Sequence, residues 1–444
     1  MRCARFGTWS VTAAAVAAVL TGAAACGGGS GGGGGGTGGN AALTYWASTE
    51  GTGAQQSQQT IGRVVSKFTK ETGIKVNFQI IPWTDLETKI LTAVTSGSGP
   101  DVVDIGNTWA PSFAATGGFV PFTKANLSKV GGAGKFVQAS FNTTGLPGKT
   151  PMSVPLYAEA YALQYNKAEF ARAGISGPPA TWSQLVADGK KLTHGGQWGI
   201  AIEGGSYTEA SHWAFILGRQ YGNPLYVNGR PHFATPAELT AVKQYVDLIG
   251  ADHIADPADA EYTSNQSVTA FAQGKAAMLI WQNPATSLGQ LGMKPSAYGI
   301  APMPMPATTP PGGQPVQSHT AGENLAIMKS TTHLQEALKF VRYMTSEPVQ
   351  VELARTYGLL PVVKAAYANP ALQTPAYQTY RNILEQHSVP MPRVASESQM
   401  ETSLGGAIVN LIRTAATTGH VSDQQIMSAL QSAQQKVAAA GAGG

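Results

Sequence analysis

Three strand-like runs alternate with helical patterns early in the chain: Leu43-Thr-Tyr-Trp46, Lys75-Val-Asn-Phe-Gln-Ile80 and Asp101-Val-Val-Asp-Ile105. The first helical pattern places its apolar residues three or four apart, at Ile61, Val64, Val65 and Phe68. The second pattern does the same with Leu86, Ile90, Leu91 and Val94. This β-α-β-α-β order predicts a mostly parallel sheet covered by helices, so we expect an α/β fold.

Upstream of this unit the sequence has the pattern of an export signal. Arg2 and Arg5 precede an apolar run from 11 to 20, and small residues lead to Cys26. An apolar run of about 10 residues is too short to span a bilayer, which takes about 20. We expect residues 1–25 to be a signal peptide and Cys26 to carry a lipid anchor.

The residues after Cys26 are almost all glycine as far as residue 39. A glycine-rich segment is a flexible spacer, so we expect residues 26–40 to tether the folded part to a membrane. Cys26 would be the sole cysteine of the mature chain, because Cys3 lies in the signal. No internal disulfide is therefore expected.

Composition narrows the classes of function. The formal charge is +4 and only 12% of the residues are charged, which excludes the strongly basic field typical of nucleic-acid-binding proteins. About 400 mature residues exceed the size at which one hydrophobic core keeps growing, so two lobes are expected.

Four blocks follow one another in a recognisable order: Ser98-Gly-Pro-Asp-Val-Val-Asp104 with Trp109, Val154-Pro-Leu-Tyr157 with Tyr165-Asn-Lys167, Phe271-Ala-Gln-Gly-Lys-Ala-Ala-Met278 with Trp281, and Gly322-Glu-Asn-Leu-Ala-Ile327 with Gly358-Leu-Leu-Pro361. Together they cover nearly all of residues 41–365. In this order they resemble the family 1 extracellular solute-binding proteins of bacterial ABC transporters, particularly the sugar receptors.

The resemblance implies a two-lobed periplasmic-binding-protein-like (type II) fold with a hinge and a ligand cleft between the lobes. Because the chain crosses between lobes more than once in that family, each lobe is expected to be discontinuous. We expect the first lobe to comprise residues 41–153 and 303–345. The second lobe would comprise residues 154–302 and 346–444.

Sugars present hydroxyl groups and apolar C–H faces, so a sugar receptor combines aromatic plates with carboxylates and amides. The candidates stand mainly just after predicted strands, where open α/β sheets bind their ligands. They are Trp46, Glu50, Trp83, Asn107, Trp109, Tyr157, Glu159, Trp213, Trp281, Asn283, Glu323 and Asn324. The resemblance places a stacking aromatic at Trp281, whereas we expect Trp182 and Trp198 to pack internally.

The resemblance implies a binding protein that captures a di- or oligosaccharide and delivers it to a membrane permease with a separate ATPase. No cofactor, metal or nucleic acid is expected, and we expect a monomer on the extracytoplasmic face of the membrane. A secreted glycoside hydrolase remains an alternative, because Glu159 and Glu323 would supply its two carboxylates. A surface adhesin is a third possibility, and the sequence does not identify the sugar.

Overall fold

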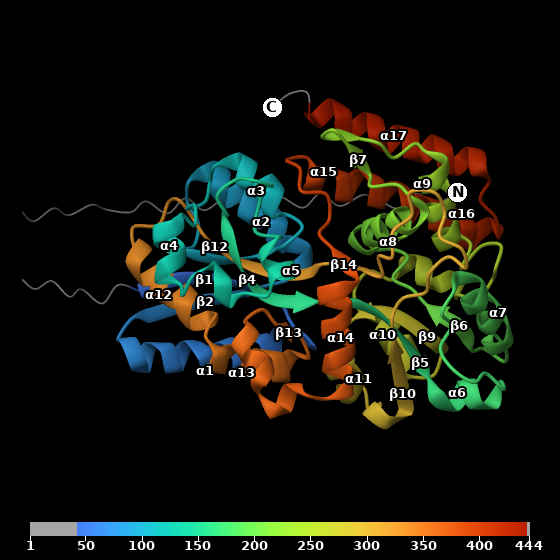
Figure 1. Cartoon of the computed structure of the whole chain (residues 1–444), viewed down its shortest axis with the longest axis horizontal. Coiled ribbons are helices and arrows are strands. Elements are labelled where there is room, and N and C mark those ends of the chain that lie inside the picture. The colour runs from blue at the N-terminus through green and yellow to red at the C-terminus, as the bar shows by residue number, and fades with distance from the viewer. Residues whose placement is uncertain (1–41, 442–444) are drawn as a thin grey trace, which may run out of the picture. The chain divides into compact units, whose positions relative to one another are not determined.

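Two separate β-sheets organise the residues that the computed structural model describes, 42–441 (Figure 1). The larger sheet has six strands in the order β13-β4-β12-β3-β1-β2. Their bounds are β1 (Ala42–Ser48), β2 (Lys75–Ile81), β3 (Val102–Gly106), β4 (Ser153–Glu159), β12 (Ala321–Ile327) and β13 (Leu360–Pro361). This sheet with its covering helices forms the first lobe.

The first lobe begins with the β-α-β-α-β unit that the sequence predicts. Strand β1 pairs in parallel with both β2 and β3, whereas β12 runs antiparallel to β3 and β4. The helices of this part are α1 (Ala54–Thr72), α2 (Trp83–Ser96), α3 (Ala110–Thr116), α4 (Lys124–Lys129), α5 (Gln138–Phe141), α12 (Leu334–Met344), α13 (Glu347–Tyr357) and α14 (Pro375–Gln386). The predicted α/β architecture is confirmed.

Helix α1 shows why the sequence folds in this way. Its apolar residues at helical spacing, among them Ile61, Val64 and Phe68, are fully buried against the sheet. Gly73 ends the helix in the left-handed conformation with φ of 73°, which glycine adopts without a steric penalty.

Segments distant in sequence lie side by side in the first lobe, as blue α1 and orange α13 show in Figure 1. Lys67 Nζ on α1 lies 2.7 Å from Glu352 Oε2 on α13. Leu353 and Tyr380 belong to the hydrophobic cluster around the six-stranded sheet, and β13 pairs with β4. Residues 347–384 thus pack with the core of the first lobe, whereas we expected the second lobe to resume at residue 346.

The second lobe is built on a four-stranded sheet in the order β10-β5-β9-β6. Its strands are β5 (Tyr161–Asn166), β6 (Trp198–Ala201), β9 (Ala276–Gln282) and β10 (Tyr298–Ala301). Its helices are α6 (Lys167–Arg172), α7 (Trp182–Leu192), α8 (Tyr207–Tyr221), α9 (Pro236–Val246), α10 (Gln266–Ala272), α11 (Ala285–Gln290), α15 (Glu397–Met400), α16 (Gly406–Thr418) and α17 (Asp423–Gly441). A π-helical turn (Glu401–Gly405) joins α15 to α16.

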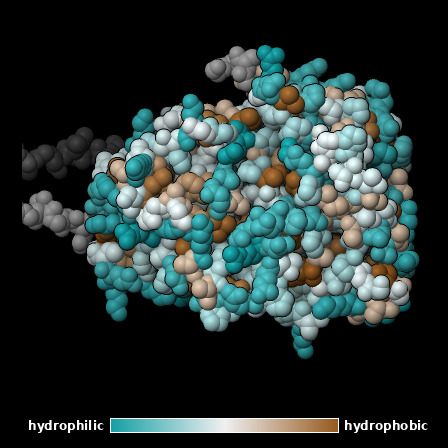
Figure 2. Space-filling model, viewed as in Figure 1, coloured by the Kyte–Doolittle hydropathy of each residue, from teal (hydrophilic) through white to brown (hydrophobic). Residues whose placement is uncertain are grey.

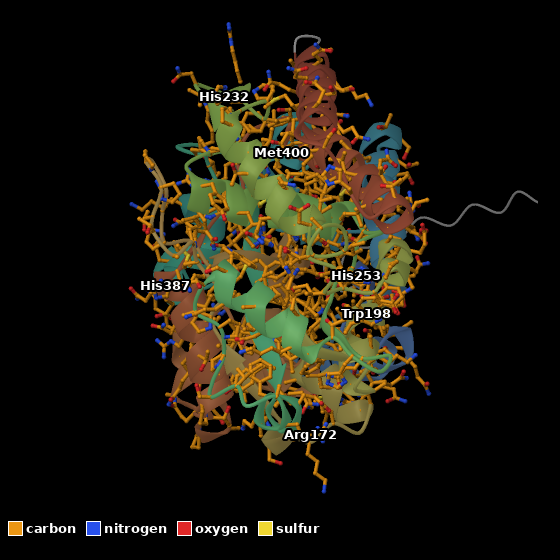
Figure 3. The ribbon with its side chains drawn as sticks, turned by 90° about the vertical axis from the view of Figure 1, so that its right-hand side faces the viewer. Arg172, Trp198, His232, His253, His387 and Met400 are labelled. Atoms are coloured by element: carbon orange, nitrogen blue, oxygen red, sulfur yellow. The ribbon has the colours of Figure 1, made fainter. Side chains whose placement is uncertain are left out.

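Two tryptophans of the second lobe have the packing role predicted for them. Trp182 is buried in the core, where its Nε1 donates to Gln220 Oε1 at 2.7 Å. Trp198 lies edge-on to His253 with ring centroids 5.1 Å apart (Figure 3). Neither side chain reaches the candidate site described below.

The chain passes between the lobes at three places. Strand β4 belongs to the first sheet and β5 to the second, so the first crossing falls at Ala160 and not at residue 153 as expected. Met303 still packs in the core of the second lobe, so the return comes later than residue 303. The return runs through β11 (Ser318–His319). This strand pairs in parallel with β14 (Ser388–Val389), which carries the third crossing.

Large hydrophobic side chains exposed on the described residues occur singly, at Leu91, Tyr207, Val227 and Leu291. The face drawn in Figure 2 likewise mixes hydrophilic residues with scattered hydrophobic ones. Within residues 42–441, no helix combines the length and the apolar character needed to cross a bilayer.

Candidate functional site

Three carboxyl groups of the first lobe gather around Ser48, at the carboxyl end of β1. The Ser48 hydroxyl donates to Glu323 Oε2 at 2.7 Å and lies 3.2 Å from Glu50 Oε1. The main-chain N–H of Ser48 donates to Asp104 Oδ2 at 3.1 Å, and Tyr45 donates its hydroxyl to Asp104 Oδ1 at 2.7 Å. One serine thus connects strands β1, β3 and β12.

These three acids are hard to ionise together. Burial raises the pKa of Asp104 to about 8, with hydrogen bonds from Tyr45 and Ser48 opposing part of the rise. Burial also raises the pKa of Glu50. The pKa of Glu323 lies well above its usual range, first because it is buried and then because Glu50 and Asp104 repel its charge.

A second polar group surrounds Tyr161, the first residue of β5. Its hydroxyl donates to Glu209 Oε2 at 2.5 Å, and Gln282 Nε2 donates to the same hydroxyl at 2.7 Å. His212 Nδ1 lies 2.9 Å from this oxygen. Because the tyrosine proton goes to Glu209, the remaining lone pair accepts from Nδ1–H, and Nε2 of His212 carries no proton.

Burial determines the charge states in this second group. It raises the pKa of Glu209 to about 8, and the charges of Glu203 and Glu401 add to the rise. It lowers the pKa of His212 to about 3. The imidazole is therefore neutral at physiological pH and does not compensate the carboxyls beside it.

Glu401, on the π-helical turn of the second lobe, links the two lobes. Its Oε2 accepts a hydrogen bond from Trp109 Nε1 of the first lobe at 3.3 Å, and its Oε1 lies 3.4 Å from His212 Nε2. Burial raises the pKa of Glu401 to about 7. A protonated Glu401 donates to the bare Nε2 of His212, which explains how two acceptors stand face to face.

An aromatic plate lies on the first-lobe side of this link. Trp83 and Trp109 stack with ring centroids 4.3 Å apart and an interplanar angle of 25°, and Trp109 is only 2% exposed. Gly106 permits the stack, since a Cβ there would come within 2.9 Å of both indoles. Trp46 packs against the same hydrophobic cluster, with Lys89 Nζ 4.4 Å from its ring centroid.

Glu159 is the last residue of β4, two residues before Tyr161 of the second polar group. It is half-buried, and its pKa is raised first by burial and then by the charges of Glu50 and Glu209. The carboxyl therefore interacts with acids from both lobes. Glu50, Trp83, Trp109, Glu159 and Glu323 are the predicted residues that the fold brings to this junction.

The three predicted asparagines each make a hydrogen bond to the backbone. Asn107 Nδ2 donates to the Thr320 carbonyl at 2.8 Å, and Asn324 Nδ2 donates to the Thr143 carbonyl at 3.0 Å. Asn283 Oδ1 accepts from the N–H of Ala160 at 3.0 Å. These bonds hold strand ends and the first crossing, so these amides have a positioning role. Sequence position alone does not reveal that role.

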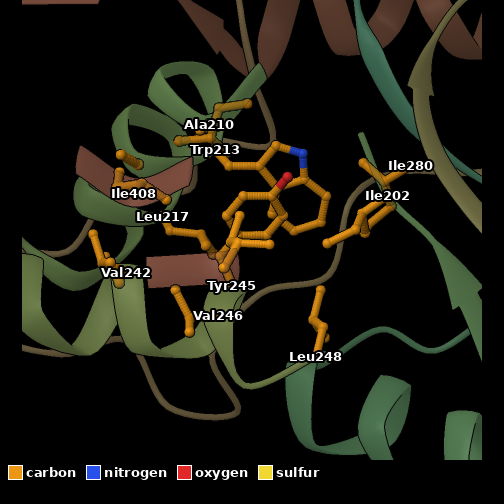
Figure 4. Close-up of a cluster of buried hydrophobic side chains, with 14 of the residues drawn as sticks. Ile202, Ala210, Trp213, Leu217, Val242, Tyr245, Val246, Leu248, Ile280 and Ile408 are labelled. Carbon is orange, nitrogen blue, oxygen red and sulfur yellow. The ribbon is translucent and has the colours of Figure 1, made fainter. Parts of the chain in front are cut away.

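Trp213, which the sequence predicts as a ligand-binding residue, packs in the core of the second lobe. It stacks on Tyr245 with ring centroids 4.4 Å apart and is surrounded by aliphatic side chains (Figure 4). Tyr157 is also buried, edge-on to Tyr357 at 6.0 Å. Trp281 is half-buried at the end of β9, where it packs against the cluster around Phe271.

Sequence analysis missed Asp104, Glu209, His212 and Glu401 as site residues. Asp104 lies inside a predicted strand between Val103 and Ile105, where no sequence pattern distinguishes its carboxyl. Glu209 and His212 share a face of α8, three residues apart, and that spacing is too common to be informative. The position of Glu401 depends on the π-helical turn, and no sequence pattern predicts that turn.

A sizeable cavity lies elsewhere. It has a volume of about 820 Å³ between α16 and α17, lined by amide, hydroxyl and small side chains such as Asn410, Gln424 and Ser428. None of the predicted ligand-binding residues lines it. We place the candidate site at the lobe junction because the acids and the aromatic stack lie there.

Comparison with known proteins identifies the family of the chain. Residues 52–351 match a family model, whose description is bacterial extracellular solute-binding protein. The diacetylchitobiose binding protein DasA of Streptomyces coelicolor is 26% identical over 341 residues, covering 74% of each chain. A maltotriose-binding protein of Pyrococcus abyssi is 24% identical over 336 residues, or 74% of this chain and 69% of that protein.

Solved structures share the fold over almost the whole chain. The GacH receptor of Streptomyces glaucescens superposes with a TM-score of 0.75 at 21% identity, covering 90% of this chain and 99% of that chain. A solute binding protein from Thermotoga lettingae, bound with α-D-tagatose, gives 0.77 at 21% identity, covering 89% and 100%. These likenesses establish the two-lobed architecture.

Proposed function

The chain belongs to the family of bacterial extracellular solute-binding proteins, and from that membership we propose that it captures a sugar for an ABC importer. The sugar is a di- or oligosaccharide, held between the lobes and released to a membrane permease. Two relatives are named for oligosaccharides, diacetylchitobiose and maltotriose, which supports a carbohydrate ligand.

The contact of Trp109 with Glu401 is the observation that carries this proposal. It joins an aromatic plate of the first lobe to a carboxyl of the second, 3.3 Å from Trp109 Nε1 to Glu401 Oε2. Indole faces pack against the C–H faces of sugars, and carboxyl oxygens accept hydrogen bonds from hydroxyls. A sugar that replaces this direct contact meets both kinds of partner at once.

Lobe closure completes the proposed site. The crossings at Ala160 and at the β11–β14 pair are short, which suits a hinge. A ligand stabilises the closed form only through its better fit to that form. The energy of closure therefore comes from contacts with both lobes.

The location of the protein follows from the family and from the sequence. Family membership places the folded part outside the cytoplasm. We propose that Cys26 is lipidated and that the glycine-rich segment tethers a monomeric receptor near its permease. Cys26, the signal peptide and the tether all lie outside the described residues.

Cleavage of a glycoside has less support than capture. Glu159 pairs with Ala321 and Glu323 pairs with Tyr157, so the two acids lie diagonally on neighbouring strands, roughly 7–8 Å apart. Hydrolysis needs one protonated and one ionised carboxyl. Burial raises the pKa of both groups, which disfavours the ionised partner.

Intrinsic tryptophan fluorescence tests the proposal. Purified full-length protein is titrated with mono- and oligosaccharides, alongside the variants Trp109→Phe and Trp198→Phe. We expect a saturable change with one sugar class that Trp109→Phe reduces and that the remote control Trp198→Phe retains. Silence with every sugar contradicts carbohydrate capture, and consumption of the sugar supports the hydrolase instead.

A further inference from the structure

A strap, residues 393–401, follows β14 in the second lobe and reaches across to the first lobe. Arg393 Nη1 donates to the carbonyl of Asn142 at 2.9 Å, and the main-chain N–H of Ser398 donates to Ser112 Oγ at 3.0 Å. Both donors belong to the strap and both acceptors belong to the first lobe. The strap therefore connects the two lobes by hydrogen bonds.

The third bond of the strap is the contact of Glu401 Oε2 with Trp109 Nε1 at 3.3 Å. Trp109 directly precedes α3, and Ser112 lies within that helix. Helix α15 of the strap packs against α3, as Figure 1 shows. Because Asn142 ends α5, the strap contacts two separate elements of the first lobe.

The strap is anchored in the second lobe. Met400, labelled in Figure 3, is fully buried in the core of that lobe, and Ser396 Oγ lies 2.9 Å from the Tyr226 hydroxyl. The π-helical turn that follows lies directly on the start of α8, since a Cβ at Gly405 would collide with the carbonyl of Tyr207. These contacts make the strap move with the second lobe.

Separation of the lobes would break the contacts of the strap with the first lobe. Rotation about the three crossings carries the strap with the second lobe and its partners with the first. Arg393, Ser398 and Ser112 are half-buried, so water takes the place of the lost partners. A hydrogen bond that water can replace contributes little by itself, but several bonds from one anchored segment act together.

Other bonds between the lobes lie beside the crossings. Asn283 Oδ1 accepts from the N–H of Ala160 at the first crossing. Gln164 Nε2 donates to the Tyr380 hydroxyl at 2.7 Å, on the helix α14 that leads into β14. Bonds beside a hinge are little disturbed by its rotation, whereas those of the strap reach α3 and the end of α5.

We propose that residues 393–401 hold the closed lobes together, and that they control how long a bound sugar stays without selecting which sugar binds. The closing role depends on the contacts of the strap alone, whereas the effect on release rests on the proposed capture of a sugar. A sugar that takes over the contact of Trp109 with Glu401 leaves the bonds of Arg393 and Ser398 in place. Arg393 and Ser112 are thus positioning residues.

Small-angle X-ray scattering of the ligand-free full chain tests the closing role. The double variant Ser112→Ala/Arg393→Ala removes one acceptor and one donor, and we expect its radius of gyration to exceed that of the wild type. The matched control is Ser66→Ala/Arg413→Ala, because Ser66 bonds within α1 and Arg413 pairs with Glu261 inside the second lobe. Equal radii for the strap variant and the wild type would overturn the inference.

Stopped-flow tryptophan fluorescence tests the effect on release, with diacetylchitobiose and maltotriose as probes. We expect the strap variant to release either sugar at least fivefold faster. Association becomes no slower, because the lobes open more readily, and the ratio of the two affinities stays the same. Ser112→Thr and Arg393→Lys keep the acceptor and the donor, so these variants should release sugar nearly as slowly as the wild type.

The outcomes separate this inference from the proposed function. An unchanged release rate, slower association or a changed ratio of affinities would contradict the role of the strap while leaving sugar capture intact. If neither sugar binds, the proposed capture of such sugars loses its support, and the scattering comparison still decides whether the strap holds the lobes together.

Discussion

Replacing Glu401 by glutamine should stabilise the ligand-free protein at alkaline pH. The side chain is 1% exposed, and burial raises its pKa from 4.5 to about 7. Glutamine has the shape of the protonated acid: its oxygen accepts from Trp109 Nε1, and its amide donates to His212 Nε2. The variant therefore keeps both contacts and removes the cost of a buried charge.

The size of the gain follows from linkage. A carboxyl whose pKa is raised on folding causes no loss of stability below its unfolded pKa of 4.5, and causes the full loss above the folded value of about 7. Each pKa unit corresponds to about 1.4 kcal/mol. Glu401→Gln should thus add up to about 3 kcal/mol at pH 8 and under about 1 kcal/mol at pH 5.

Chemical denaturation at the two pH values measures this difference. Glu385→Gln serves as the control, because Glu385 is exposed and pairs with Arg381 on the surface. A gain that is the same at pH 5 and pH 8 would refute the electrostatic argument. A loss of stability at pH 8 would show that the carboxylate is needed where the structure places it.

The remaining predictions concern other parts of the molecule. Thermal unfolding of the ligand-free wild type should occur at a lower temperature at pH 8 than at pH 5.5. The reason is that burial raises the pKa values of Asp104 and Glu209 to about 8, so folding is less favourable once these groups ionise. A higher melting temperature at pH 8 would contradict this. Trp213→Ala should lower the free energy of unfolding by about 3–5 kcal/mol, measured by urea denaturation, and a loss below 1 kcal/mol would contradict its place in the core. Trp109→Ala should weaken sugar binding at least tenfold in calorimetry while unfolding stays cooperative, and unchanged affinity would remove the indole from the site. Cys26→Ala should move the protein from the membrane to the soluble fraction on cell fractionation, and retention on the membrane would argue against lipidation.

The sequence was informative wherever local periodicity and burial agree. The runs at 43–46, 75–80 and 101–105 correspond to β1, β2 and β3. Their alternating or continuous apolar residues can be buried together when the segment forms a strand of a covered sheet. The boundaries of the lobes were less predictable. Strand β13 is only two residues long, and its pairing with β4 depends on tertiary contacts that leave no periodic signal.

The site was predictable in part for the same reason. Glu50, Trp83 and Trp109 follow strands, and strand ends meet at one edge of a sheet, so position alone predicts them as candidates. Trp213 resembled a ligand-binding residue by its type, but its helix is buried on nearly all sides. His212 and Glu401 are far apart in sequence, and only the packing of α8 against the π-helical turn brings them together.

Calorimetric titration of full-length protein with carbohydrates, followed by chromatography of the recovered ligand, tests the central claim most directly. The account predicts that one class of di- or oligosaccharide binds saturably at one site per chain and is recovered unchanged. Failure of every carbohydrate to bind, or recovery of cleaved sugar, would contradict it.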